Sequence, residues 1–154
     1  LRPLDLMQDY RLMMGTRFGV GKAKNLYAYW SERVTGTLAD DLANSGSRTV
    51  VNLASSEYFK AVDAKKLGAQ VITPEFKEKV AVGYKPVQTF VKLQRGALTR
   101  YIIQHRILDA EQVKAYGGEG YRCSPEESTA TKWVFLRDKR PPLVTRKVQG
   151  GRIR

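Results

Sequence analysis

Apolar residues in this chain follow two different spacings, and this mixture constrains the fold more than any other feature. In residues 24–44 and again in 95–108, large apolar side chains recur every three or four positions, as on one face of a helix. The stretches 49–53 and 133–136 are instead short, continuous apolar runs, which is typical of strands buried on both faces. A chain of 154 residues with both patterns is predicted to form one α+β domain.

Shorter patterns add further expected elements. Strands are predicted at 70–74, 80–84 and 87–91, with the last two as a hairpin, and short helices at 54–62 and 109–116. A serine at the start of the first short helix and Asp109 at the start of the second are typical N-terminal caps. We therefore expect a folded domain over 1–137 and a disordered basic tail over 138–154.

The net charge of +12 is concentrated in two segments that contain no acidic residue. One segment runs from Lys79 to Leu108 and the other from Lys139 to Arg154. Concentrated positive charge attracts polyanions, so nucleic acid is the predicted partner, and a solvated basic surface is the alternative. No apolar run is long enough to span a bilayer, and no basic segment has a broad apolar face, so a membrane partner is not expected.

Basic residues of the second predicted helix form candidate phosphate contacts. On a helical wheel, Arg95 and Arg106 lie on one line beside the apolar arc, and Lys92 lies just upstream. One guanidinium group can donate two parallel hydrogen bonds to the oxygens of a phosphate. The alternative is that these basic residues form surface ion pairs or are simply solvated. His105 falls inside the apolar arc and is expected at the core or its boundary. The full set of candidate nucleic-acid contacts is Lys92, Arg95, Arg100 and Arg106, followed by Arg2 and Lys22.

Metal and thiol chemistry are not expected. The chain has one cysteine, Cys123, and one histidine in a separate segment, which cannot form a closed four-ligand site. We therefore predict no metal and no other cofactor. Cys123 lies in a predicted polar turn and is expected to be an unreactive thiol. The single cysteine also excludes an internal disulfide, which fits a reducing compartment.

The junction between the strand 49–53 and the following helix is the second candidate site. Such a junction presents free N–H groups and a positive helix end, which is where mixed α/β folds hold anions or substrates. In one interpretation, the serines only cap the helix and Asn52 bonds to a neighbouring loop. In the other, Asn52, Ser55, Ser56 and Glu57 line the pocket of an enzyme that acts on a nucleotide or nucleic-acid base. Glu57 would then be the acid or base, with Lys92 or Arg95 holding phosphate.

Several landmarks, in order across residues 1–136, resemble the bacterial YaaA family of peroxide-stress proteins. They are Leu1–Met7, Tyr10-Arg11, Leu26-Tyr27 with Trp30, Asn52–Lys60, Lys65–Leu67, Lys92 with Arg95-Gly96 and Arg100, Ile102-Ile103, Glu119–Tyr121 and Val134-Phe135. The resemblance implies a mixed β-sheet wrapped by helices and a cytoplasmic location. It also implies DNA binding linked to protection against peroxide and iron-driven damage, with no securely attached catalytic activity.

The resemblance also implies how much of the family's DNA-binding motif to expect. The family's chain begins upstream and carries a helix-hairpin-helix whose turn offers backbone N–H groups to DNA phosphates. Only the distal part of that motif, near residues 1–6, is expected here, and the basic tail beyond Arg140 lies outside the resemblance. The predicted function is therefore DNA binding in the oxidative-stress response, through phosphate contacts made by a basic surface.

Overall fold

The computed structural model describes residue 19 and residues 21–138, which contain two α-helices, α3 (Leu26–Ser45) and α4 (Gln88–Gln104). Short 3-10 helices complete the helical part of this region: η2 (Tyr58–Ala61), η3 (Ala110–Ala115) and η4 (Gly118–Gly120). Arg2, the distal helix-hairpin-helix segment near residues 1–6, and residues 139–154 of the expected tail lie outside the described residues.

The strands of the described region form one mixed sheet around β2 (Gln70–Lys79). β2 pairs in parallel with β1 (Thr49–Val51) at its start and with β5 (Lys132–Arg137) over most of its length. β3 (Tyr84–Lys85) is antiparallel to the end of β2, and β4 (Arg122–Thr129) is antiparallel to β5. The order β1-β2-β5-β4, with β3 beside β2, confirms the predicted α+β fold with a mixed sheet.

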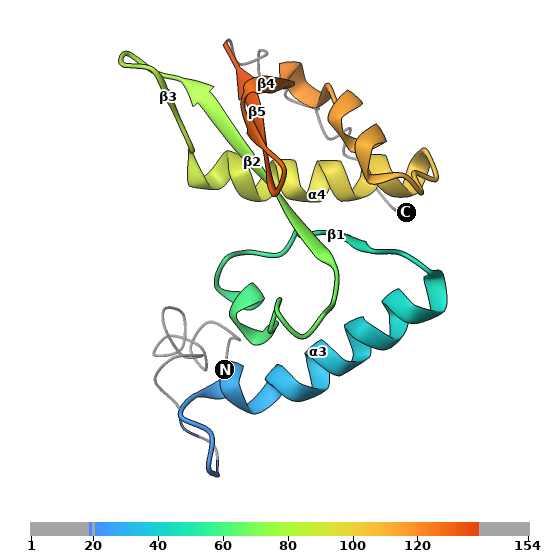
Figure 1. The fold of residues 1–154 in the computed structure, drawn as a ribbon. Coiled ribbons are helices and arrows are strands. Elements are labelled where there is room, and N and C mark those ends of the chain that lie inside the picture. The colour runs from blue at the N-terminus through green and yellow to red at the C-terminus, as the bar shows by residue number, and fades with distance from the viewer. Residues whose placement is uncertain (1–18, 20, 139–154) are drawn as a thin grey trace, which may run out of the picture.

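β2 connects two regions of the molecule, as Figure 1 shows. One region contains α4, β4, β5 and the 3-10 helices η3 and η4, and the other contains α3, β1 and η2. The strand continues through Pro74, where the sequence predicted its end. At position 74 a backbone N–H would point to the edge of β2 that pairs with β1. The pairing with β1 ends before this position, at the pair Val51–Ile72. The missing donor therefore breaks no hydrogen bond of the sheet.

Helix α3 confirms the helix predicted at 24–44. The side chain of Asn25 caps its start by accepting a hydrogen bond of 2.8 Å from the Ala28 N–H. Gly46 ends the helix with φ of 65°, a left-handed conformation that glycine adopts without a Cβ clash. Tyr27 and Thr35 attach the helix to the η2 region, where the buried Thr35 hydroxyl accepts from the Asp63 N–H at 2.9 Å.

The hairpin predicted at 80–84 and 87–91 is wrong. Residues 80–83 form a tight turn in which the Val80 N–H donates to the Gly83 carbonyl, and β3 contains two residues. Residues 88–91 are the first turn of α4, because Val91, Leu98 and Ile102 continue the helical spacing toward the core.

The end of the second predicted helix also differs from the prediction. α4 ends at Gln104, and Arg106 takes φ of 49°, so it leaves the helix and does not lie on a line with Arg95. His105 and Leu108, which the helical wheel placed on the apolar arc, are both exposed. The His105 ring contacts Tyr101 at the helix end, with ring centroids 4.4 Å apart.

Strand β4 was not predicted, and β1 is less buried than predicted. β4 has a polar sequence because only β5 pairs with it among the described residues, and its Pro125 is tolerated where no second partner strand follows. Cys123 therefore lies in a strand and not in a turn. β1 is half-buried, since it pairs only with β2 in the described sheet.

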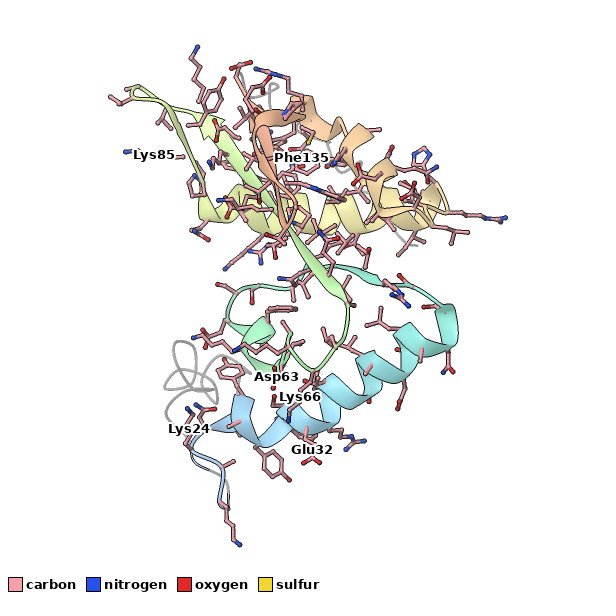
Figure 2. The ribbon with its side chains drawn as sticks, in the orientation of Figure 1. Lys24, Glu32, Asp63, Lys66, Lys85 and Phe135 are labelled. Atoms are coloured by element: carbon pink, nitrogen blue, oxygen red, sulfur yellow. The ribbon has the colours of Figure 1, made fainter. Side chains whose placement is uncertain are left out.

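The hydrophobic core lies between the sheet and α4. Phe135 of β5 occupies its centre, as Figure 2 shows, stacked on Phe76 of β2 with ring centroids 5.2 Å apart. Tyr116 and Tyr121 pack edge-on against Phe76, and Leu98 of α4 closes the core from the helix side. These contacts join the chain segments that the sequence patterns predicted as helix and strand.

A buried arginine extends this core at the end of the sheet. Arg137 is 1% exposed, and its guanidinium pairs with the carboxylates of Glu78 and Glu119, the latter at 3.3 Å. The group also lies over the ring of Tyr121, 4.4 Å from its centroid, and the Tyr121 hydroxyl donates to Glu78. Arg137 therefore holds two strands and η4 together through one side chain.

Gln94 links helix α4 to the same cluster. Its amide donates to Glu119 at 2.7 Å and accepts from the Tyr116 hydroxyl at 2.7 Å. Burial raises the pKa of Tyr116 to about 12 and also raises the pKa of Tyr121. Both hydroxyls therefore stay protonated and act as donors at neutral pH. We call Glu78, Gln94, Tyr116, Glu119, Tyr121 and Arg137 the Arg137 cluster.

Replacing Arg137 with alanine is expected to lower the free energy of unfolding by about 3–5 kcal/mol, because the buried Glu78 carboxylate would lose the guanidinium group. The matched control is Arg122→Ala, which removes an exposed arginine paired with Asp138 and should leave the unfolding midpoint nearly unchanged. Urea unfolding measures both. Equal losses in the two variants would contradict a special role for the buried pair.

Candidate functional site

A groove of about 530 Å³ runs along the edge of β2 between the end of β1 and the start of β3. We call it the β2 groove. It brings together residues from the β1–η2 junction, β2, η2 and the first turns of α4. The polar and aromatic members of its lining include Asn52, Ser56, Phe59, Lys60, Thr73 and Arg95.

Along this groove, no described strand pairs with the edge of β2 that faces away from β5. In the parallel pairing, the Thr73 N–H donates to the Thr131 carbonyl beside β5, so odd-numbered residues of β2 bond to β5 and even-numbered residues face the other side. On that other side, the pairing of β1 with β2 ends at Ile72, and the pairing of β3 with β2 starts at Glu78. The backbone N–H of Phe76 and the carbonyl of Pro74 therefore face the groove with no strand beside them in the described residues.

Asn52 forms the inner wall of the groove where β1 ends. It is buried, its side-chain carbonyl accepts from the Ala54 N–H at 3.0 Å, and its amide donates to the Thr73 hydroxyl at 3.3 Å. These contacts confirm that a polar side chain in this apolar run needs partners. The predicted serine N-cap is wrong, because Glu57 precedes η2 and its side chain makes no capping bond. Ser55 accepts from the Tyr58 N–H at 3.2 Å, and Ser56 lines the groove.

Glu57 points away from the lining and toward α3. Its carboxylate accepts hydrogen bonds from the Tyr27 hydroxyl and from Lys60, the latter at 2.9 Å. The Tyr27 bond first, and then the Lys60 bond, hold the pKa of Glu57 below its ordinary value of 4.5. The same bond to Glu57 is the main reason that the pKa of Tyr27 rises to about 12. Glu57 thus fastens the η2 region to α3.

Arg95 is the predicted cation that the structure places in the groove. Among residues 19 and 21–138, no carboxylate lies within ion-pair distance of its guanidinium, which lies near the Val91 carbonyl of its own helix. Lys60 also lines the groove but is paired with Glu57, and the ammonium of Lys77 is 2.7 Å from Glu127 of β4. Arg95 is therefore the uncompensated cation of the described groove.

The other predicted cations are not part of this lining. Lys92 and Arg100 are exposed on α4, Arg106 is exposed beyond the helix end, and Lys22 is exposed before α3. Sequence reasoning missed Lys60 and the Phe76 N–H. The position of Lys60 at the end of the 52–60 motif was an available signal, whereas the bare edge depends on strand register.

Residues 19 and 21–138 contain neither a cluster of metal ligands nor a helix that could span a membrane. In that part of the chain, no three His, Cys, Asp or Glu side chains gather as metal ligands would. The described helices also include none with the length and apolar character needed to cross a bilayer. The one described cysteine, Cys123, is a half-buried free thiol 3.9 Å from the Ser128 hydroxyl.

The structure thus defines an α+β domain with a cationic groove at a bare sheet edge. A family model described as peroxide stress protein YaaA matches residues 1–127, and the chain belongs to this family. It is similar to a UPF0246 protein of Neisseria gonorrhoeae (48% identity over 139 residues) and to one of Hahella chejuensis (45% over 138 residues). Each match covers 90% of this chain and 54% of the relative, so the chain spans about half the length of these curated relatives.

The lowered pKa of Glu57 predicts acid-sensitive attachment of α3. Because the folded-state pKa lies below the unfolded value, this contribution to stability is complete above pH 4.5 and is lost as pH falls through the folded-state pKa. The Glu57→Gln variant should show a smaller loss of thermal midpoint between pH 6 and pH 3.5 than the unmodified chain. The control Glu111→Gln removes another carboxylate paired with a lysine and should keep the original pH dependence. Equal behaviour of the two variants would refute the assignment.

Proposed function

We propose that this protein binds nucleic acid, with DNA as the main partner, through phosphate contacts in and beside the β2 groove. The observation that carries the proposal is the uncompensated Arg95 in a groove that Phe76 also lines, since no described strand pairs with the backbone N–H of Phe76. A guanidinium and a free amide are the donors that phosphate oxygens accept from. In a peroxide-stress family, such binding would limit peroxide- and iron-driven damage to DNA.

The basic residues outside the groove extend the proposed contact surface along α4. Lys92 and Arg100 are exposed on that helix, and none of Lys92, Arg100 and Arg106 is ion-paired with a carboxylate of the described residues. Side chains of this kind add sequence-independent affinity to a phosphate backbone. Lys22 and Arg2 remain further predicted contacts, with Arg2 outside the described residues.

An enzyme that acts on a nucleotide or nucleic-acid base is the second candidate. The observation that favours it is the size of the groove, since about 530 Å³ lies in the range of small-molecule pockets. Asn52 and Ser56 line this space, while Ser55 accepts from the Tyr58 N–H and Glu57 binds Tyr27 and Lys60. For this candidate, Ser56 is the groove hydroxyl that a reaction would use.

The binding proposal predicts a specific change in salt dependence. Arg95→Ala should reduce the slope of log K against log salt for duplex DNA by about 0.9, because one phosphate contact is lost. Arg106→Ala, which removes a cation outside the groove, should have a smaller effect on affinity at low salt. Fluorescence anisotropy with a labelled duplex over a salt series measures both variants. An unchanged slope in Arg95→Ala, or binding that is insensitive to salt, would refute the proposal.

The enzyme candidate predicts turnover that depends on Ser56. Incubation of the protein with nucleotides and with damaged DNA, followed by product analysis, should then show a product that Ser56→Ala abolishes while DNA affinity persists. Ser55→Ala is the matched control, because that hydroxyl accepts from the Tyr58 N–H and is not part of the groove lining. No product across the substrates would leave binding as the remaining proposal.

A further inference from the structure

The outer edge of β1 presents backbone groups that no described residue pairs with. The Gln70 N–H donates to Arg48 at 2.8 Å, and the Asn52 N–H donates to Ile72 at 2.7 Å. Even-numbered residues of β1 therefore bond to β2, and the N–H and carbonyl of Thr49 and Val51 point outward. The Ser47 hydroxyl satisfies both groups of Thr49, at 3.3 and 3.1 Å, but nothing in the described residues does so for Val51.

A groove of about 390 Å³ with both polar and apolar lining residues lies beside this edge. Its apolar lining comes from β1, the end of α4, and η3, and includes Val51, Leu53, Ile102, Ile107, Leu108 and Val113. Leu108 on its rim is 98% exposed, and Asp109 is the charged residue of the lining. We call this feature the β1 groove. A strand placed beside Val51 would cover Leu108 and the half-buried apolar side chains of this lining with its own.

The opposite edge of the described sheet is protected, and this contrast makes the β1 edge informative. β4 carries Pro125, a register shift between Ser124 and Thr129, and the acidic pair Glu126 and Glu127. Proline, bulges and charges are the usual means by which edge strands avoid pairing. β1 has the sequence Thr-Val-Val, with no charge and no proline. It therefore has the character of an inner strand.

We infer that the outer edge of β1 accepts a further strand, apolar and rich in β-branched residues, supplied by the part of the protein that the longer relatives carry. Almost half of each relative lies outside the match to this chain, which provides length for such a strand. The three residues of β1 offer a short edge, so a strand in the same polypeptide is favoured over a second copy. A strand in the same polypeptide avoids the loss of translational and rotational freedom that association of two molecules costs.

Overlapping peptides of about 12 residues, which tile the unmatched part of the Neisseria gonorrhoeae relative, test this inference on the full 154-residue chain. Amide hydrogen exchange at Val51 is the readout, with Val50 as an internal reference because its N–H faces β2. In the free chain Val51 should exchange much faster than Val50. One peptide, or two that overlap, should slow exchange at Val51 by at least tenfold and leave Val50 unchanged.

Two matched variants distinguish binding at the β1 groove from nonspecific binding of the peptide to exposed apolar residues. Leu108→Lys places a charge on the rim of the β1 groove, whereas Val82→Lys changes another highly exposed apolar residue, in the turn between β2 and β3. Leu108→Lys should weaken the active peptide at least tenfold, and Val82→Lys should not. Val51→Pro removes the outward N–H donor and should weaken binding of the active peptide at least tenfold, measured as peptide affinity because a proline has no exchangeable amide.

Three results would overturn the inference. In the first, no peptide protects Val51. In the second, Val51 is already protected in the free chain in a concentration-dependent way, which would indicate a second copy. In the third, it is protected at every concentration, which would indicate the chain's own residues outside the described part. DNA binding is not involved in any of these measurements, so the proposed function stands or fails separately.

Discussion

The ion pair between Arg137 and Glu78 is the interaction on which the arrangement of this domain depends. Two charges removed from water are favourable only when their geometry is good and their remaining groups are hydrogen-bonded. Tyr121 donates to Glu78, and Glu119 accepts from Arg137 Nη1, whereas the buried Nε–H of Arg137 has no hydrogen-bond partner in the described residues. Tyr121 and Glu119 each come from a different part of the chain than Arg137. The cluster therefore fixes where the end of the sheet, η4 and helix α4 lie relative to one another.

The same cluster sets the direction of the groove cation. Gln94 is 0% exposed and bound on both sides, to Glu119 and Tyr116, so α4 cannot rotate about its axis without breaking a buried hydrogen bond. Arg95 follows Gln94 by one residue, about 100° around the helix, and this rotation places it in the β2 groove. A buried structural network thus orients the side chain that we propose for phosphate contact.

Much of the fold could be predicted from apolar spacing, because β5 buries one continuous apolar run, and α3 and the start of β2 each carry a regular apolar spacing. The prediction failed where local sequence and tertiary context disagree. Four of the five residues 87–91 are β-branched or aromatic, yet Val91 reaches the core only as part of a helix. Strand β4 is polar because its edge must resist pairing, and this removes the alternation that identifies strands.

The candidate site was also predictable in part, because some of its residues stand out in the sequence pattern and others depend on the sheet register. The junction at Asn52 was visible as a polar residue in an apolar run, and Arg95 as a cation beside an apolar arc. The bare edge at Phe76 depends on where β1 ends and β3 begins, which only the sheet register defines. Chemical-shift changes of the Phe76 amide and the Arg95 Nε–H, measured by NMR as a short oligonucleotide is added, test the central claim most directly. The account predicts that both signals shift and saturate together, whereas shifts confined to residues outside the β2 groove would contradict it.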